Sequence, residues 1–224
     1  MPVPGPRPLR IRTPRLELVA SDAELAALDA AHDHAGLARR LAARVPDRWP
    51  PPLTEDVLAF FADKMARCPE ETGWWAWMIV RDEAPVAQTV PPAGEASGSD
   101  PPTGASNHGA TRAGAGGPAG RVLIGGGGFK GPPGPDGEVE IGYSILPAFQ
   151  RRGYATEAMR GLMAWGFADP RVTAVAAETF PELEPSLRVI AKLGLTHVGP
   201  GLEAGTDRFA MTRAAWQAQH AAAR

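Results

Sequence analysis

A segment of 33 residues, from Gln88 to Gly120, limits what this chain can fold into. It holds eight glycines and five prolines, Val90 is its only large aliphatic residue, and it contains no aromatic residue. Such a composition cannot bury enough apolar surface to offset an ordering cost of roughly 1–2 kcal/mol per residue. We therefore expect a disordered insertion, which a fold can tolerate because the entropic cost of closing a loop grows only logarithmically with its length.

Strand and helix patterns alternate on both sides of this insertion. Before it, strand patterns cover residues 9–19, with a break at Thr13-Pro14, and residues 74–81, and helical patterns cover about 22–31, 36–44 and 54–67. After it, strand patterns cover residues 121–130, 138–146, 172–179, 196–198 and 208–212, and helical patterns cover about 153–168, 184–193 and residues from 214. This mixture favours an α+β fold with a mixed, mainly antiparallel twisted sheet flanked by helices. We expect a single domain over residues 9–224, after a disordered N-terminus at residues 1–8.

Charge and residue usage argue against several classes of function. The net charge of −2 provides no long-range field that would attract nucleic acid or an anionic membrane. The histidines are scattered, His32 and His34 would point to different faces of a helix, and Cys68 is the only cysteine, so we expect no metal site and no intrachain disulfide. No apolar run is long enough for a signal-peptide core or a membrane span, which predicts a cytoplasmic protein.

The segment from Glu138 to Ala158 carries the chemistry. Alternating apolar residues indicate a strand that ends near Leu146, and Gly153 lies in the turn that opens the next helix. The first amide N–H groups of a helix have no internal partners and the helix dipole is positive at this end, so a pyrophosphate fits there. Arg151 and Arg152 add positive charge beside the same place.

Three stretches of the chain resemble one protein family. The run Ile-Gly-Tyr-Ser-Ile-Leu-Pro-Ala-Phe-Gln-Arg-Arg-Gly-Tyr-Ala-Thr-Glu-Ala at residues 141–158 is similar to the coenzyme A signature of the GNAT acetyltransferase superfamily, Gln/Arg-x-x-Gly-x-Gly/Ala. Within that superfamily, Thr-Pro-Arg-Leu-Glu-Leu at residues 13–18 resembles the first strand of the branch that includes the ribosomal-protein alanine N-acetyltransferases, and residues 185–195 resemble its late helix. The resemblance covers about residues 9–213, apart from the insertion.

The resemblance implies where acetyl-CoA, the co-substrate, would bind. The sheet of this family is split by a bulge, here near Ile145 and Leu146. In that opening the pantetheine arm pairs with the strand backbone, and the phosphates lie over residues 151–156. The implied cofactor-binding residues are Ile145, Leu146, Gln150, Arg151, Arg152, Gly153, Tyr154, Ala155 and Thr156. The resemblance implies no metal.

Transfer of acetyl to a primary amine by direct attack in a ternary complex requires a base for the amine and a proton for the leaving thiolate. Glu140 is the candidate base, because it lies on the strand that should line the cleft and resembles an acidic position of many family members. Glu138 on the same face is the alternative, and both could instead be solvent-facing strand residues. Ser186 could hydrogen-bond the coenzyme near its sulfur or simply belong to a first helical turn. The acid is not evident, because Ile190 stands where many relatives have a tyrosine and Tyr143 is interpreted as a packing residue; water could serve.

The acceptor and the occurrence of catalysis both stay open. Trp74, Trp75 and Trp77 could wall an acceptor pocket or belong to the core, and Trp49 could lie in an acceptor-side loop. Protein N-termini, small amines and amino-sugar antibiotics are all compatible acceptors, and a homodimer is compatible with the sequence. A non-catalytic acyl-CoA-binding or sensor domain of the same fold is the alternative function, because the usual tyrosine is missing. A dinucleotide site at Gly125–Gly128 is disfavoured, because no helix follows the glycines.

Overall fold

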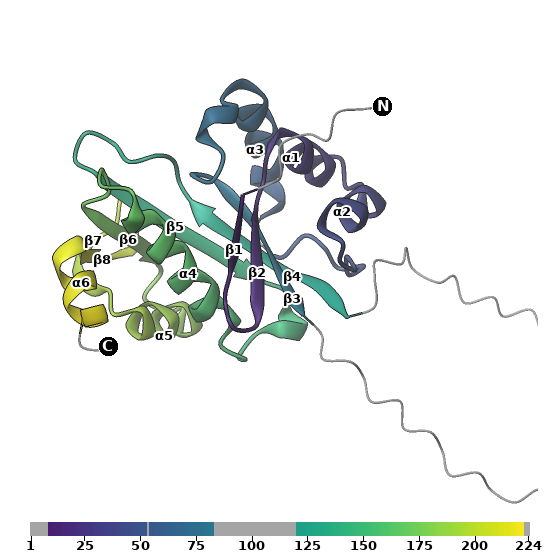
Figure 1. Cartoon of the computed structure of the whole chain (residues 1–224). Helices are drawn as coiled ribbons and strands as arrows, with labels where there is room; N and C mark the ends of the chain where they lie inside the picture. Colours follow the sequence, from purple (N-terminus) through teal and green to yellow (C-terminus); the bar gives the residue numbers. More distant parts are fainter. Residues whose placement is uncertain (1–8, 53, 83–119, 222–224) are drawn as a thin grey trace, which may run out of the picture.

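An eight-stranded sheet organises the part of the chain that the structure describes, residues 9–52, 54–82 and 120–221 of a computed structural model (Figure 1). The strands are β1 (Arg10–Arg12), β2 (Leu16–Ala20), β3 (Ala76–Asp82), β4 (Arg121–Phe129), β5 (Glu138–Ile145), β6 (Ala174–Thr179), β7 (Thr196–Pro200) and β8 (Asp207–Thr212). Their order across the sheet is β1-β2-β3-β4-β5-β6-β8-β7. Every neighbouring pair is antiparallel except β5 and β6, which run parallel. The predicted fold class is confirmed.

Helices precede, separate and follow the strands where the sequence predicts them. They are α1 (Ala23–Ala30), α2 (His34–Leu41), α3 (Glu55–Arg67), α4 (Tyr154–Ala168), α5 (Glu184–Leu193) and α6 (Arg213–Ala221), with short 3-10 turns η1 (Pro69–Glu71) and η2 (Pro147–Phe149). Figure 1 shows α1, α2 and α3 gathered at one end of the molecule and α4, α5 and α6 toward the other.

The two faces of the sheet bury separate apolar cores. Strand residues alternate between the faces, so Trp77 and Ile79 of β3 pack with α4, whereas Met78 and Val80 pack with α1 and α2. The core that contains α4 and α5 is the larger of the two, and it extends under β5, β6 and β8. The α1–α2 core stops at the edge of β5 with Leu146. On this second face, the remaining surface of β4 and β5 faces α3.

The sheet is split between its two parallel strands. β5 pairs with β6 only from Glu138–Ala174 to Glu140–Ala176, and beyond that point β5 continues along β4 while β6 continues along β8. The position of the irregularity differs from the expected bulge at Ile145 and Leu146. Pairing of β4 with β5 is continuous up to Ile145, and the Leu146 N–H still bonds the Ile124 carbonyl at 2.9 Å. One register shift lies a strand away, at Ile79/Val80 in the β3–β4 ladder, and a second lies at His197/Gly199 in the β7–β8 ladder.

The predicted insertion connects two antiparallel neighbours. Asp82 at the end of β3 and Arg121 at the start of β4 are register partners. The insertion itself, except Gly120, and the predicted disordered N-terminus at residues 1–8 lie outside the described residues. Among the helices of the described ranges, none has the length and apolarity needed to cross a bilayer.

Candidate functional site

The turn between β5 and α4 has an unusual backbone. Arg151 has φ +61° and Gly153, which precedes the first residue of α4, has φ +82°. A non-glycine residue in the left-handed region costs roughly 1 kcal/mol, and such residues cluster at ligand-binding turns. No side chain caps α4, so the first N–H groups of the helix are not taken by a capping group. The positive end of the α4 dipole is therefore available to an anion at this turn.

The nine predicted cofactor-binding residues divide into exposed and buried groups. Gln150, Arg151, Arg152 and Gly153 are exposed, whereas the side chains of Ile145, Leu146, Tyr154 and Thr156 are buried and that of Ala155 is half-buried. The side chains of Ile145, Leu146 and Tyr154 belong to the cores, so only their backbone can face a ligand. The Gln150 side chain donates from Nε2 to the Ile145 carbonyl at 2.8 Å, which ties the turn to the end of β5.

The turn that joins β1 to β2 clamps the start of α4. The Thr13 hydroxyl and the Arg15 N–H donate to Glu157 Oε1 at 2.6 and 2.8 Å, and Arg15 Nε donates to Glu157 Oε2 at 2.6 Å. Arg15 Nη1 also donates to the Arg152 carbonyl at 3.1 Å. Burial raises the pKa of the Glu157 carboxyl, but these hydrogen bonds and the Arg15 charge outweigh it and hold the pKa below its ordinary value. The sequence contains both halves of this clamp, yet nothing in their spacing pairs them.

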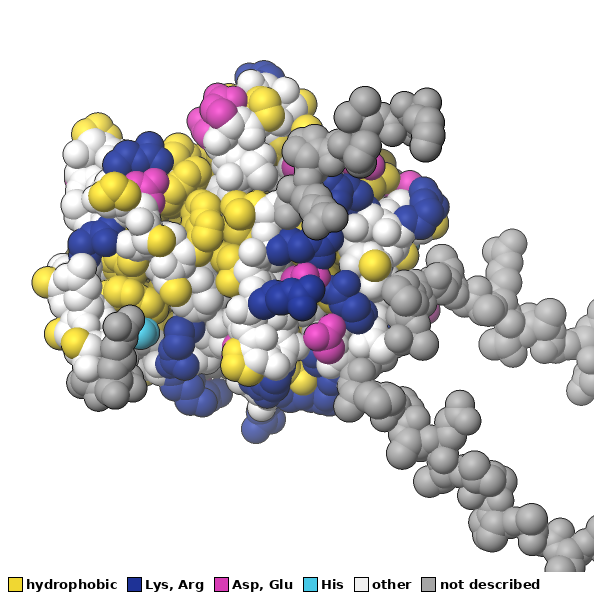
Figure 2. All heavy atoms as spheres, in the orientation of Figure 1, with side chains coloured by type: hydrophobic (Ala, Val, Ile, Leu, Met, Phe, Trp, Pro, Cys, Tyr) yellow, Lys and Arg dark blue, Asp and Glu magenta, His cyan; other side chains and the backbone are white. Residues whose placement is uncertain are grey.

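Tyr154 is a packing residue beneath the same turn. Its ring is buried, the Arg15 guanidinium lies 4.7 Å from the ring centroid, and its hydroxyl accepts a bond from Arg81 Nη1 at 3.3 Å. These contacts join the turn that opens α4 to the β1–β2 turn and to β3. Figure 2 shows Lys and Arg side chains gathered over β1 and β2 and along the lower edge of the molecule.

Tyr143 and Ser186 meet across the split in the sheet. Tyr143 leaves β5 on the α4–α5 face, and its hydroxyl lies 3.3 Å from Ser186 Oγ at the start of α5. Burial raises the pKa of the Tyr143 phenol, and the hydrogen bond with Ser186 only partly opposes this. The hydroxyl therefore stays protonated near neutral pH and can act as a donor. The expected packing role describes the ring of Tyr143, and the contact of its hydroxyl was missed because it depends on how α5 returns to β5.

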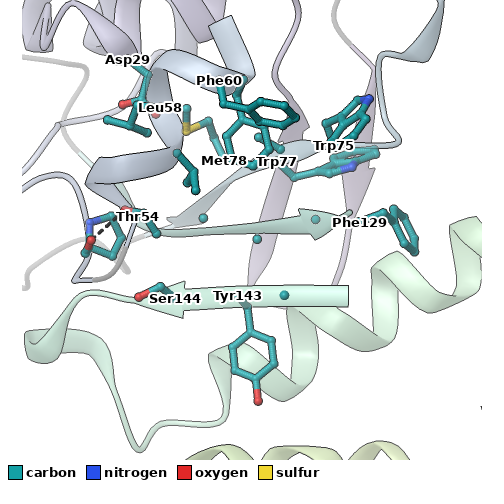
Figure 3. A pocket seen from close by; sticks show the side chains of 18 of the residues that line it. Asp29, Thr54, Leu58, Phe60, Trp75, Trp77, Met78, Phe129, Tyr143 and Ser144 are labelled. Atoms are coloured by element: carbon teal, nitrogen blue, oxygen red, sulfur yellow. Dashed lines mark hydrogen bonds between the residues drawn. The ribbon is translucent and has the colours of Figure 1, made fainter. Parts of the chain in front are cut away.

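A cavity of about 540 Å³ lies on the opposite face, between α3 and strands β3, β4 and β5 (Figure 3). Its lining is mainly apolar and includes Phe60 and Phe61 from α3, Trp75 from the β3 region, and Trp49 from the loop before α3. Trp77 of β3 is also part of the lining, although its side chain is buried in the core on the α4 side. Trp74 does not line this cavity. Its ring packs in the other core, 4.8 Å from Trp165 and 5.4 Å from Phe129 between ring centroids. The tryptophan cluster of the sequence thus contributes to both the core and the cavity.

Asp29 is a buried acid in the lining of this cavity. It is 6% exposed, and Trp49 Nε1 donates to its Oδ1 at 2.6 Å. Burial raises the pKa of the Asp29 carboxyl, and the bond from Trp49 and the nearby His32 and His34 oppose the rise only in part. This pair fixes the Trp49 ring as a wall of the cavity.

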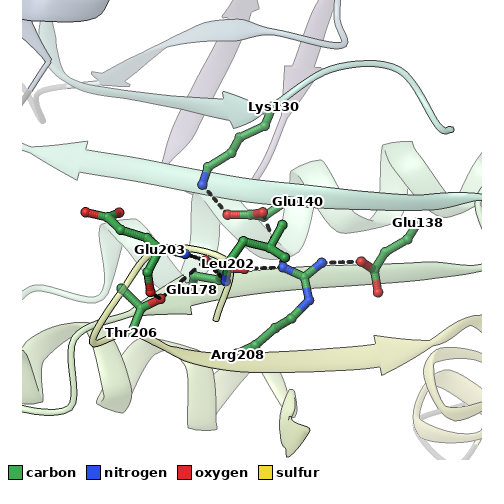
Figure 4. A network of polar contacts seen from close by, with 8 residues as sticks. All are labelled: Lys130, Glu138, Glu140, Glu178, Leu202, Glu203, Thr206 and Arg208. Carbon is green, nitrogen blue, oxygen red and sulfur yellow. Dashed lines mark hydrogen bonds and ion pairs between the residues drawn. The ribbon is translucent and has the colours of Figure 1, made fainter. Parts of the chain in front are cut away.

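Glu140 lies on the cavity face of β5, in a network of charged side chains (Figure 4). It is on the same strand face as Gly142, which lines the cavity, and it pairs with Lys130, another lining residue. On its other side, Arg208 of β8 approaches Glu140 at 3.4 Å and also pairs with Glu138 and Glu178. Glu140 and Glu138 are thus neither free solvent-facing residues nor in contact with the turn that opens α4.

The other features singled out by the sequence have structural roles. Gly125–Gly128 are part of β4, and no helix follows them, as expected. A Cβ at Gly128 would lie 1.7 Å from the Trp75 carbonyl oxygen, so close strand approach requires glycine there. Within the described residues, Cys68, Glu70 and Glu71 form one group whose geometry could hold a metal ion, but Glu71 already bonds Lys64 and Trp75.

Comparisons with known proteins agree with this architecture. The acetyltransferase (GNAT) domain family matches residues 15–196. FsC-acetyl coenzyme A-N(2)-transacetylase of Aspergillus fumigatus is 33% identical over 87 residues, which cover 34% of this chain and 37% of the relative. The uncharacterized N-acetyltransferase YnaD of Bacillus subtilis is 37% identical over 60 residues, covering 27% and 35%. The chain therefore spans little more than a third of the length of these curated relatives.

Solved structures share the fold at low sequence identity. A ribosomal-protein-S5-alanine acetyltransferase from Vibrio fischeri superposes with a TM-score of 0.55 at 13% identity, covering 93% of this chain and 98% of that one. An acetyltransferase of the GNAT family from Bacillus anthracis gives a TM-score of 0.51 at 16% identity, covering 92% and 99%. Since the family match extends over most of the sequence, from the β1–β2 turn to the start of β7, this protein belongs to the acetyltransferase (GNAT) domain family.

Proposed function

We propose that this protein transfers the acetyl group of acetyl-CoA to a primary amine, by direct attack in a ternary complex. One observation carries the proposal: the left-handed turn at Arg151 and Gly153, which opens α4, follows the part of β5 that has separated from β6. The turn offers an anion site, and the separation leaves one edge of β5 without a strand partner beyond Glu140. A ligand with a diphosphate and an amide-containing arm matches both features.

The residues present fit the donor. The exposed Arg151 and Arg152 and the N–H groups at the start of α4 would hold the pyrophosphate. Gly153 has φ +82°, a conformation that strains any side chain, and a Cβ there would lie 3.4 Å from Arg15 Nη2. The backbone of Ile145 and Leu146 would face the pantetheine arm, and Gln150 would keep the turn closed on β5. Acetyl-CoA supplies an activated thioester.

Glu140 is proposed as the group that accepts the proton of the amine, directly or through water. It is 12% exposed, lies on the cavity face of β5, and is oriented by Lys130 and Arg208. Glu138 is the weaker candidate, because its contact is with Arg208 on the side away from Lys130. The amine nitrogen bonds the acetyl carbon, the C–S bond breaks, and the displaced proton passes to Glu140.

Tyr143, oriented by Ser186, is proposed as the proton donor to the departing thiolate. Its hydroxyl is on the far side of β5 from the cavity, beside the gap between β5 and β6 (Figure 3). Ile190, the residue at the family's tyrosine position, is buried and 2% exposed, so it offers no donor. Tyr143 would supply from β5 what that position supplies from the late helix.

A paired assay tests the proposal. Coenzyme A binding is measured by calorimetry, and thiol release from acetyl-CoA is measured with a panel of primary amines. We expect both binding and amine-dependent release. Binding without release on any amine would favour the alternative, a non-catalytic acyl-CoA-binding domain, which the apolar Ile190 supports. No binding of coenzyme A or acetyl-CoA would overturn both.

A further inference from the structure

The cavity beside β5 has the size and chemistry of a small-molecule site. Its volume of about 540 Å³ falls within the usual range of roughly 300–1,000 Å³ for such sites. Apolar side chains predominate in the lining, and Asp29 and Lys130 are its charged members within the described residues. In Figure 2, hydrophobic side chains gather in the hollow between α3 and the β4–β5 connection.

The floor of the cavity contains two glycines that protein packing does not require. A Cβ at Gly142 would meet no atom within 4 Å, and one at Gly126 would meet only the Trp77 carbonyl oxygen, at 3.6 Å. Neither glycine has a φ in the left-handed region. Glycine in a strand interior weakens the strand, and it often marks a place where a ligand approaches the backbone closely. The floor of the cavity therefore has no side chain over these two glycines. Glu140 lies on the same face of β5, two residues before Gly142.

The outer wall of the cavity is aromatic and held in position. Phe60 and Trp75 pack edge to face with ring centroids 5.5 Å apart, although Phe60 is 49% exposed. Trp75 Nε1 donates to Glu71 at 2.7 Å, and Lys64 lies 5.1 Å from the centroid of the Trp75 ring. The two rings contact each other and together form one aromatic wall, against which a flat apolar group can pack.

We infer that the acceptor is a primary amine with an aromatic or bulky aliphatic body, which lies over Gly126 and Gly142 against Trp75 and Phe60. The inference rests on the proposed function and names its substrate class. The amine would point along β5 toward Glu140, and the apolar body would fill the cavity. A polar polyhydroxylated amine, such as an amino sugar, would leave its hydroxyl groups without partners on this lining.

The test compares pairs of amines that differ only in the apolar body. Initial rates are measured for 2-phenylethylamine against ethylamine, and for the peptide Phe-Gly-Gly against Gly-Gly-Gly. We expect a KM at least about tenfold lower for the aromatic member of one pair or both. A preference within the first pair identifies a free amine, and a preference within the second identifies a peptide N-terminus with the same chemistry.

Gly142→Val tests the role of the cavity without changing the proposed donor site. The new side chain projects into empty space, so the variant should fold, and it should remove the aromatic preference while coenzyme A affinity is kept. Gly134→Ala is the matched control, because Gly134 lies in the β4–β5 connection outside the cavity lining and its Cβ would touch only a flexible Asp136 carboxylate at 3.3 Å. We expect the control to retain the wild-type preference.

The outcomes distinguish the two levels of the proposal. Absence of coenzyme A binding by the wild-type protein would contradict the proposed function itself. Equal KM values within both pairs, or a preference that survives Gly142→Val, would overturn the substrate class alone. If the donor binds but no amine reacts, calorimetric titration of 2-phenylethylamine into the coenzyme A complex decides: binding that Gly142→Val abolishes supports the inference, and no binding overturns it.

Discussion

The turn that opens α4 and the cavity under α3 are built in opposite ways. The turn is a contiguous stretch, residues 150–156, whose backbone conformation is set by Gly153 and Arg151. The cavity takes its walls from α1, the loop at Trp49, α3, β3, β4 and β5, which are spread from residue 29 to residue 144. The turn depends on residues that are adjacent in the sequence, whereas the cavity forms only when distant segments come together on folding. A site of the first kind can be recognised in sequence, and a site of the second kind cannot.

Among the variants proposed here, Gly153→Glu should have the largest effect, a loss of coenzyme A affinity. The left-handed φ strains any side chain at this position, and a carboxylate would lie beside the proposed pyrophosphate. Repulsion of about 4 kcal/mol, for unit charges about 4 Å apart near a surface, corresponds to roughly a thousandfold loss of coenzyme A affinity. Calorimetry measures the loss, and unchanged affinity would show that the turn is not the donor site. Gly134→Ala should bind coenzyme A normally.

Glu140→Gln tests whether Glu140 accepts the proton of the amine. Loss of the proton acceptor should lower kcat about a hundredfold and leave coenzyme A affinity intact, because Glu140 does not contact the α4 turn. Glu138→Gln, which removes a neighbouring carboxylate from the same Arg208, should have a much smaller effect. Equal losses in the two variants would assign both residues to the ion-pair network and neither to catalysis.

Tyr143→Phe tests the link between the two regions. We expect kcat to fall about tenfold to a hundredfold, since water can replace the hydroxyl in part. Because burial raises the pKa of Tyr143, the wild-type kcat should not decline as the pH rises through 9 to 10, where an ordinary phenol begins to lose its proton. A pH–rate profile identical in wild type and Tyr143→Phe, with equal kcat, would remove Tyr143 as the acid.

Glu157→Gln tests whether the turn that opens α4 depends on its hydrogen bonds with Thr13 and Arg15. Three hydrogen bonds reach this carboxylate, so its loss should lower the free energy of unfolding by about 1–3 kcal/mol near pH 7. The pKa of Glu157 is held below its ordinary value, so its stabilising effect is present above an ordinary pKa of 4.5. The effect is lost as the pH falls through the lower, folded-state pKa. Urea midpoints of both proteins should converge over that acidic range, and a gap independent of pH would contradict the assignment.

Deletion of residues 91–118 has the smallest expected effect. Asp82 and Arg121 are register partners, so a much shorter connection can still join β3 to β4. If the segment is a disordered loop, shortening it should raise the free energy of unfolding by about 1 kcal/mol at most. Thermal melts compare the two proteins. Loss of a cooperative melt would show that the segment is part of the fold.

Sequence patterns predicted the strands and helices because most of them have an apolar period, and glycine and proline mark many of their ends. They also predicted the turn that opens α4, which is the proposed donor site, because the glycine and arginines that shape it are adjacent. The clamp from Arg15 to Glu157 and the contact of Tyr143 with Ser186 join residues far apart in the chain, so no local pattern encodes them. The same reason hides the cavity: Trp74 and Trp75 are neighbours in sequence, yet one packs in the core and the other walls the cavity.

The most direct measurement is a crystal structure of the protein with coenzyme A. The account predicts the pyrophosphate within hydrogen-bond distance of the N–H groups at the start of α4, between Arg151 and Thr156, and the pantetheine arm along β5 where β6 has separated from it. Phosphates bound at another surface, with the α4 turn left facing solvent, would contradict it.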